Sequence, residues 1–426
     1  MRVCKFNERD LSKKDKLRIL TVFPSIFLII GLLLTIIQLE SHVSLVMGFK
    51  KILISPAILI TDFLSVGGIS ATYLNVALIG FYNIYLLKKY ELRINGLIIA
   101  AFMTVLGFSF FGKNVFNILP IYLGGYLYSL RQDIEFKDII VSIMFATALA
   151  PIISEISFAI ELKNDLSIYL GIAIGVFVGF IITPLAAHMV KFYDGYNIYN
   201  IGFTAGIIGT ILTSTLRSLN ISVEPVNILY LENSPIIILT LLIMFIYLIC
   251  IGIYINKGIF KEYKNIFRYS GRVVTDYTYL VGYGLTFFNM GLMGLICLLY
   301  VILIGGIVNG PVIAGIFTVV GFSAFGKHLK NCTPIALGVI IMALVFKEDI
   351  TYTSTIITVL FSTTLAPLAG VYGYKLGILA GMLHFILATN VGIIHGGINL
   401  YNNGFAGGLV AGFLLPMIDA FRKRGE

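Results

Sequence analysis

Two lysines in apolar surroundings are the residues of this sequence best suited to bind a solute. Lys113 lies in GFSFFGKNVFNILPIYLGG (residues 107–125), and Lys327 lies in GFSAFGKHLKNCTPIALG (residues 321–338). A lysine ammonium has three N–H donors and a positive charge, so it can bind an anion or a carbonyl oxygen. Placing it in lipid costs a few kcal/mol, so the chain must either use the group or let it reach the surface.

The two lysine motifs belong to an internal duplication. Lys327 follows Lys113 by 214 residues (327 minus 113), and the same offset pairs Asp62 with Asp276. Asparagines recur in the same way, some at a shifted offset; the pairs are Asn75/Asn289, Asn95/Asn309, Asn117/Asn331, Asn197/Asn399 and Asn200/Asn402. The chain therefore consists of two related halves, about 1–217 and 218–426, as in many transport proteins.

The recurring pattern FGKxxxNxxP predicts a membrane span that ends, breaks and restarts as a short half-helix. Its proline has no N–H to donate and disfavours helix in the residue before it. Broken helices near the axis between two repeats form solute sites in transporters. We therefore predict a solute site made of Lys113, Asn117, Asn75 and Phe108 with Lys327, Asn331, Asn289 and Phe322.

Each of these candidates has a structural alternative. The lysines can snorkel to the headgroups if they lie at the ends of spans. The asparagines can join helices through hydrogen bonds, and the phenylalanines can pack. Asp62 and Asp276 are candidates for ion coupling, and their alternative role is to cap the helix that follows each of them.

The composition predicts the elements that must position these residues. Of 426 residues, 58% are hydrophobic and 12% are charged, and the mean hydropathy is +0.96. Soluble domains carry about 25% charged residues. We predict an all-α polytopic membrane protein with about ten to fourteen transmembrane segments, some of them broken or re-entrant.

In the first half, clear spans are predicted at 17–39, 63–87, 94–112, 138–160 and 168–190. Two shorter segments, 116–130 and 198–216, either cross the membrane or re-enter it. Segments 41–60 and 256–272 are predicted to lie at the interface.

The basic residues predict the orientation. The net charge of +9 is concentrated in residues 1–18, in 256–272 and at the C-terminus. The basic segment precedes the first span of half one, whereas it follows the equivalent span of half two, at about 235–255. Because basic segments stay in the cytoplasm, equivalent spans run in opposite directions, and the halves are inverted repeats with both termini cytoplasmic.

These patterns divide the chain into a basic cytoplasmic N-terminus (1–18), two membrane repeats (19–217 and 218–421) and a basic cytoplasmic tail (422–426). The cytoplasmic (inner) membrane is the predicted location. The sequence lacks the HExxH, GxSxG, P-loop and CxxC patterns, so no catalytic residue, metal site or cofactor is predicted. A basic face with stacking aromatics is also missing, which argues against nucleic-acid binding.

The G-F-S-x-F-G-K and Y-N-x-G-F-x-x-G motifs resemble an uncharacterised family of multi-pass membrane proteins from clostridia and their relatives, over nearly the whole chain. The resemblance implies an integral membrane protein and no particular substrate. The segment NVALIG (75–80) is similar to the Asn-x-Ala-Leu-x-Gly pattern of urea transporters, which are inverted duplications with phenylalanine-lined pores. Their Leu-Pro-x-x-Thr-x-Pro-Phe signature is missing here. This second resemblance favours a small polar solute.

The main functional hypothesis is a transporter or channel for a small polar or anionic solute, with its site between the two halves. Its partners would be the solute and the lipid bilayer, and a homo-oligomer is compatible with it. One alternative is a membrane-embedded enzyme acting on a lipid-type substrate. Another is a non-transporting scaffold subunit, which predicts a closed core without a cavity between the halves.

Overall fold

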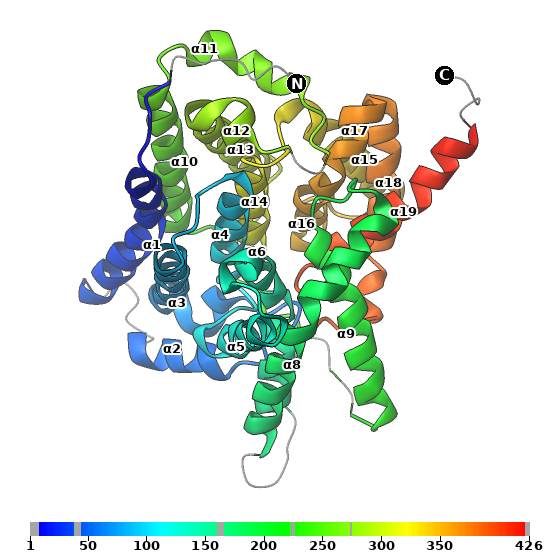
Figure 1. The fold of residues 1–426 in the computed structure, drawn as a ribbon. Coiled ribbons are helices and arrows are strands. Elements are labelled where there is room, and N and C mark those ends of the chain that lie inside the picture. Colours follow the sequence, from blue (N-terminus) through cyan, green and yellow to red (C-terminus); the bar gives the residue numbers. More distant parts are fainter. Residues whose placement is uncertain are drawn as a thin grey trace.

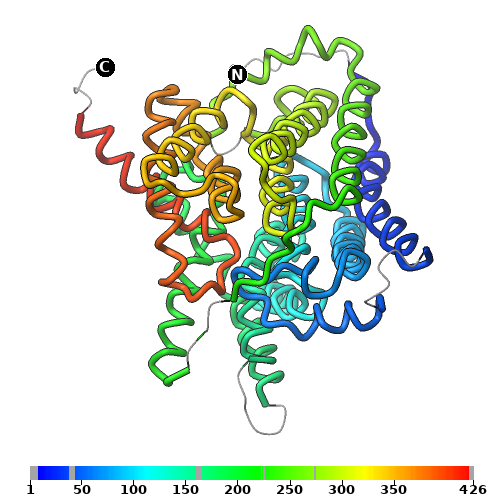
Figure 2. The backbone as a smooth tube through the Cα atoms, turned by 180° about the vertical axis from the view of Figure 1, so that it is seen from behind, coloured from blue at the N-terminus to red at the C-terminus, as the bar shows by residue number. Residues whose placement is uncertain are grey.

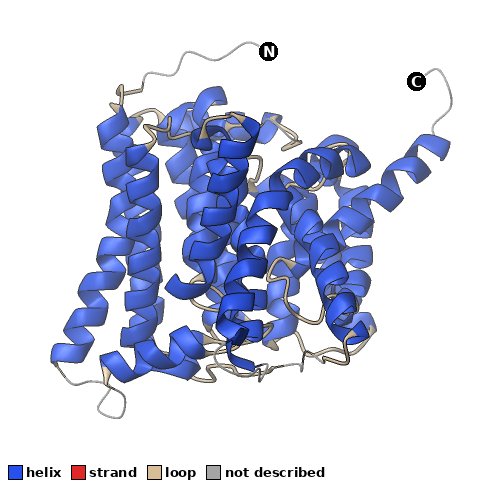
Figure 3. Cartoon of the chain, turned by 60° about the horizontal axis from the view of Figure 1, so that its bottom comes forward, coloured by secondary structure: helices blue, strands red, loops and turns tan. Residues whose placement is uncertain are grey.

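The computed structural model describes residues 8–37, 44–159, 166–221, 223, 226–272 and 275–421. Within these ranges the chain is helical, with isolated β-bridges and no strand (Figure 3). The prediction of an all-α protein is confirmed. The predicted tail 422–426 and residues 1–7 of the predicted N-terminus lie outside the described residues.

Eight helical segments of the described chain are long and apolar enough to cross a membrane. They are Lys13–Ile36, Phe63–Lys89, Phe136–Ala159, Leu166–Tyr193, Pro235–Ile255, Gly282–Leu303, Thr353–Tyr372 and Asn402–Phe421. The shortest of these has 20 residues, which at 1.5 Å per residue covers about 30 Å, the thickness of the hydrocarbon core. The protein is therefore a multi-pass membrane protein.

Five of these segments each consist of one helix. They are α1 (Lys13–Ile36), α3 (Phe63–Lys89), α10 (Pro235–Ile255), α13 (Gly282–Leu303) and α19 (Asn402–Phe421). The others combine α6 (Phe136–Ala146) with α7 (Ala150–Ser154), α8 (Leu166–Met189) with a 3-10 turn, and α16 (Thr353–Ser362) with α17 (Ala366–Tyr372). The remaining helices are α2 (Leu45–Ile54), α4 (Gly96–Phe108), α5 (Val115–Gln132), α9 (Asn200–Ser218), α11 (Ile259–Glu262), α12 (Tyr277–Leu280), α14 (Gly310–Phe322), α15 (Leu329–Val345) and α18 (Tyr374–Ala388). The eight long segments account for eight crossings, so the predicted ten to fourteen crossings require some of the shorter helices to cross the membrane as well. That count stays a prediction.

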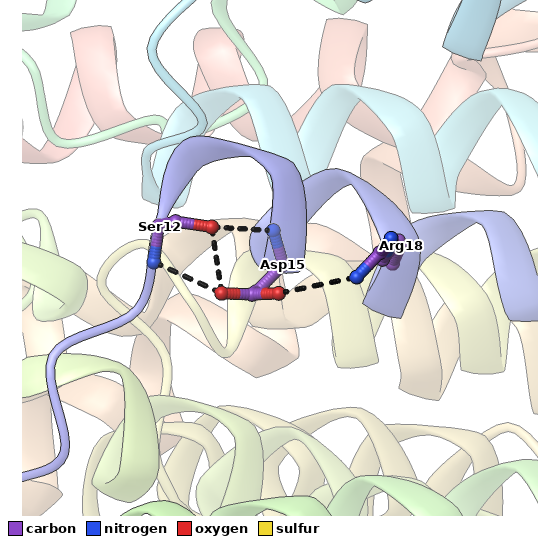
Figure 4. A network of polar contacts seen from close by, with 3 residues as sticks. All are labelled: Ser12, Asp15 and Arg18. Atoms are coloured by element: carbon purple, nitrogen blue, oxygen red, sulfur yellow. Dashed lines mark hydrogen bonds and ion pairs between the residues drawn. The ribbon is translucent and has the colours of Figure 1, made fainter.

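Helix α1 begins with a capping box (Figure 4). The Ser12 hydroxyl accepts a hydrogen bond from the Asp15 N–H at 3.2 Å, and the Asp15 carboxylate accepts one from the Ser12 N–H at 3.2 Å. Arg18 lies 3.7 Å from the same carboxylate. Two free N–H groups of the first turn are thereby satisfied, and the negative charge lies where the helix dipole favours it.

Helices α1 and α10 begin the two halves and lie side by side, running in opposite directions (Figures 1 and 2). The rings of Phe23 and Tyr247 join them in an edge-on contact, with centroids 6.2 Å apart. The segments predicted to lie at the interface contain α2 and α11, which lie at opposite ends of the bundle.

Helices α4 and α14 lie against each other at the centre of the bundle, and every residue of both is buried apart from Leu97 (Figure 1). Glycines allow this close approach. A Cβ on Gly107 would lie 2.8 Å from the Phe317 Cβ, and one on Gly321 would lie 2.8 Å from the Met103 Cβ. Both contacts are shorter than carbon atoms tolerate, so the pair packs backbone to backbone.

The predicted span 94–112 is wrong in its extent. Helix α4 has 13 residues, so it is only about 20 Å long and ends at Phe108. The chain breaks before α5 because Gly112 takes a φ of +80°, a conformation that suits glycine. The proline does not make the break: Pro120 lies inside α5, and Pro334 lies inside α15.

Candidate functional site

Both lysines lie inside the protein at these breaks. Lys113 and Lys327 have no exposed surface, so neither side chain snorkels to the headgroups. The Lys113 Nζ donates to the Tyr401 hydroxyl at 2.6 Å. The Lys327 Nζ donates to the Tyr199 hydroxyl, and to the Thr363 Oγ1 at 2.7 Å. Each lysine of one half is therefore held by a tyrosine of the other half.

Among the described residues, no carboxylate forms an ion pair with these amines. The ion pairs of the described residues all lie elsewhere, on exposed side chains. Instead, each Nζ lies over two aromatic rings. The distances to the ring centroids are 5.2 Å (Lys113 to Phe108), 4.6 Å (Lys113 to Tyr401), 4.3 Å (Lys327 to Tyr199) and 5.4 Å (Lys327 to Phe322). A desolvated cation–π contact contributes about 2 kcal/mol, less than the several kcal/mol that burying an ammonium costs. A bound anion would supply the missing counter-charge.

Six aromatic side chains from the two halves form a closed circle in which each ring contacts the next. We call this circle the aromatic girdle. Consecutive ring centroids lie 4.6, 6.5, 5.7, 4.8, 6.5 and 5.6 Å apart in the order Phe108, Tyr401, Phe145, Phe322, Tyr199, Phe361 and back to Phe108. The first three rings and the last three are equivalent positions of the two halves. Phe108 corresponds to Phe322, Tyr401 to Tyr199, and Phe145 to Phe361. The girdle therefore reflects the internal duplication.

The girdle lines a central cavity of about 190 Å³. All six rings line it, together with polar residues that include Thr104, Thr318, Asn200 and Asn403. The lysines lie outside this lining, behind the rings of the girdle. Pockets for drug-sized ligands measure roughly 300–1,000 Å³. The central cavity is therefore suited to a solute smaller than a drug-sized ligand.

A second cavity of about 390 Å³ adjoins the central one. The two cavities share Phe361, Leu400 and Asn403 as a common wall. Phe325 lines the central cavity, whereas Phe111, its counterpart at the offset of 214 residues, lines the second cavity. The cavities thus extend toward equivalent positions in opposite halves, and Phe361 is the one girdle residue of the described chain that lines both.

Backbone contacts across the halves bring the tyrosines to this place. The Ile198 N–H donates to the Thr364 carbonyl at 3.1 Å, and the Leu400 N–H donates to the Ala148 carbonyl at 3.0 Å. Ile198 and Leu400 directly precede Tyr199 and Tyr401. The Y-N-x-G-F motif of each half is therefore fixed to the T-x-L-A-P segment of the other.

The mid-span asparagines stabilise the breaks. The Asn75 Nδ2 donates to the carbonyl oxygens of Ser109 and Lys113, at 2.8 and 2.9 Å. Asn289 makes the two equivalent bonds in the second half, at the same distances. These carbonyls have lost their helical partners, so the amides satisfy polar backbone that lies buried. Neither asparagine lines the central cavity.

The motif asparagines also hold the broken backbone. Asn117 and Asn114 form a capping box at the start of α5, and the Asn117 Nδ2 donates to the Gly112 carbonyl at 3.0 Å. Asn331 donates to the Gly326 carbonyl at 2.9 Å. The structure places the predicted asparagines around the breaks, while Phe108 and Phe322 lie in the girdle.

Both aspartates cap helices. The Asp62 carboxylate accepts from the N–H of Leu64 at 2.9 Å, and it also accepts from Gly310 at 3.0 Å and Tyr230 at 3.2 Å. Asp276 caps α12 in the same way and accepts from the first residue of α4 at 3.1 Å. Each carboxylate therefore anchors the start of a central helix of the other half. A role in ion coupling stays a prediction.

Four girdle residues were missing from the predicted site: Tyr199, Tyr401, Phe145 and Phe361. Their signal was present, because all four recur between the halves. The tyrosines lie in the Y-N-x-G-F motif, and each phenylalanine lies two residues before a T-x-L-A-P segment. A search for recurring aromatic residues would have found them.

We expect Asn75→Ala to destabilise the protein by about 2–3 kcal/mol, because two buried carbonyl oxygens lose their hydrogen bonds. Asn289→Ala should have a similar effect, since its bonds are equivalent. Thermal unfolding in detergent would measure the change. Asn390→Ala is the control, because Asn390 is exposed. An unchanged unfolding temperature for both core variants would contradict the structural role.

The apolar helices and the internal site define a multi-pass membrane protein with a small cavity between two related halves. The chain belongs to the family described as "Protein of unknown function (DUF1576)", whose model matches residues 41–218 and 255–420. This confirms the resemblance to an uncharacterised family. Neither a curated protein nor a solved structure matches the chain, so the similarity to urea transporters has no support.

Proposed function

We propose that the protein carries a small polar or anionic solute across the membrane through the central cavity. The observation that supports this most is the position of two buried lysines behind the aromatic girdle, with no carboxylate partner in the described chain. A protein that needed only a stable core would gain from replacing such amines by apolar groups. Two equivalent lysines beside one cavity are instead suited to attract a solute with negative charge or carbonyl oxygens.

The two alternatives receive less support. A scaffold predicts a closed core between the halves, where the structure has a cavity of about 190 Å³. An enzyme acting on a lipid would need acids or histidines at its site, and the described residues that line the central cavity include neither. The cavity is also small for a lipid.

Inverted repeats are part of the proposal. The opposite directions of α1 and α10 (Figure 1), and the exchange of equivalent contacts between the halves, support them. In such proteins the solute site lies near the middle of the membrane, between the repeats. Facilitated passage and ion-coupled alternating access are both compatible with this arrangement.

Solute flux into proteoliposomes tests the proposal. The panel contains small neutral amides, carboxylates and inorganic anions, and protein-free liposomes provide the background. We expect selective flux for solutes of a few heavy atoms and none for solutes much larger than the cavity. If folded protein gives no flux for any of these solutes, the transport proposal is wrong.

The shared wall between the cavities predicts a gate. We expect Phe361→Ala to raise the flux roughly tenfold, which corresponds to a barrier lower by about 1.4 kcal/mol, because its ring separates the two cavities. Leu400→Ala tests the same wall with a smaller loss of packing. Phe346→Ala is the control, since that ring is 55% exposed. Unchanged or lower flux in both folded wall variants would argue against a gate at this position.

A further inference from the structure

The hydroxyl groups of Tyr199 and Tyr401 point to a specific class of solute. Both residues line the central cavity, and both hydroxyl oxygens accept a hydrogen bond from a lysine Nζ. A tyrosine hydroxyl that accepts from a cation still has its own hydrogen to donate. In the part of the chain that the structure describes, no group accepts a hydrogen bond from the Tyr401 hydroxyl.

Three other polar side chains of the lining already donate a hydrogen bond within the protein. The hydroxyls of Thr104 and Thr318 each donate to a carbonyl of their own helix at 2.7 Å. The Asn200 amide donates to the Ala186 carbonyl at 3.3 Å, and its oxygen accepts from Tyr193. The tyrosine hydroxyls are therefore donors available to a solute in the cavity, alongside the Ser142 hydroxyl and the Asn403 amide.

We propose that Tyr199 and Tyr401 determine specificity for a small monovalent anion, to which they donate hydrogen bonds while Lys113 and Lys327 supply the positive charge behind them. This inference rests on the proposed function and narrows its solute. In such a chain of hydrogen bonds the lysine ammonium donates to the tyrosine hydroxyl, and the hydroxyl donates to the anion. Each hydrogen bond is strengthened, because the lysine polarises the tyrosine hydroxyl.

The girdle also favours a single charge over two. Its rings replace the water around the solute, and the cost of removing water from an ion rises with the square of its charge by the Born relation. The positive edges of aromatic rings tolerate an anion. Four of the six rings have a lysine over one face. Monovalent anions of a few atoms, such as nitrate or formate, fit both the charge and the volume of about 190 Å³.

The test compares wild type with Tyr199→Phe/Tyr401→Phe in proteoliposomes, using nitrate, formate, sulfate and the neutral solute formamide. The double variant keeps the rings of the girdle and removes only the two donors. We expect wild type to carry nitrate and formate far faster than sulfate. We expect the variant to lose at least tenfold of the nitrate and formate flux, because hydrogen bonds to charged groups contribute about 1.5–3 kcal/mol each.

Tyr122→Phe is the matched control, because Tyr122 is a buried tyrosine that donates to Asn83 at 2.6 Å, outside the central cavity. A second measurement is thermal unfolding with and without nitrate. Nitrate should raise the unfolding temperature of wild type and of Tyr122→Phe, but not that of the double variant.

The outcomes separate the two proposals. Flux of formamide that exceeds anion flux, or anion flux unchanged in the double variant, would refute the anion inference and leave a transporter. Absence of all flux in folded wild type would refute the proposed function and the inference with it.

Discussion

Lys113→Met/Lys327→Met should abolish most solute flux while leaving the protein at least as stable as wild type. In the proposed function each lysine supplies a positive charge beside the central cavity. A charged interaction of about 1.5–3 kcal/mol corresponds to a roughly ten- to hundredfold loss of binding for each residue. Stability should be retained or should rise, because methionine fills a similar volume without an unbalanced buried charge. Flux in proteoliposomes and thermal unfolding in detergent measure the two effects.

Lys330→Met is the control for this pair. Lys330 lies three residues after Lys327 in the chain and is exposed, so its loss should change neither flux nor stability. A double variant that unfolds readily would show that the lysines are structural. A stable double variant with full flux would remove the lysines from the path and leave the cavity to be explained without them.

Asp62→Ala should cause the largest loss of stability of any single change that we describe. Its carboxylate accepts hydrogen bonds from three backbone N–H groups, and one of these belongs to Gly310 at the start of α14. The three donors lose a buried partner together, so we expect a cost of about 3–5 kcal/mol. Asp276→Ala should also destabilise the protein strongly, through α12 and α4.

The Asp62→Asn variant distinguishes a role of Asp62 in helix capping from a role in ion coupling. The asparagine oxygen can still cap α3, but its NH₂ group then faces the N–H of Gly310 and cannot accept from it. If Asp62 only caps helices, the variant should lose an intermediate amount of stability. Its solute flux should depend on an ion gradient in the same way as the wild-type flux. Ion coupling predicts a stable protein whose flux no longer follows an ion gradient. Asp349→Ala is the control, since that aspartate is exposed and should change stability by less than about 1 kcal/mol.

The helical class and most long spans could be predicted from the sequence, because apolar runs of about 20 residues have few other structures open to them. The recurring asparagines lie around the predicted breaks, and their role in binding a solute stays a prediction. The recurring Asn95 and Asn309 cap α4 and α14, a role that the sequence analysis did not predict. Asp62 and Asp276 cap α3 and α12, which is the alternative role that the sequence offered for them. These are local interactions, and local interactions follow from short stretches of sequence.

The centre of the site could not be predicted in the same way. Lys113 and Tyr401 are 288 residues apart, and nothing in either motif indicates that the two meet. The break depends on the positive φ of Gly112, one glycine among 43 in the chain, whereas the nearby proline gave a stronger but misleading signal. Only the packing of the two halves places Tyr199 and Tyr401 in the girdle.

Chemical block of the central cavity is the most direct test of the proposal that solute passes through this cavity. Thr104 lines that cavity and is 2% exposed, and Thr104→Cys would introduce a thiol there with little change in volume. Methyl methanethiosulfonate adds a small S–CH₃ group to such a thiol. We predict that the reagent stops solute flux in Thr104→Cys proteoliposomes and leaves wild-type flux intact. Full flux through fully modified Thr104→Cys protein would mean that the solute does not pass through this cavity.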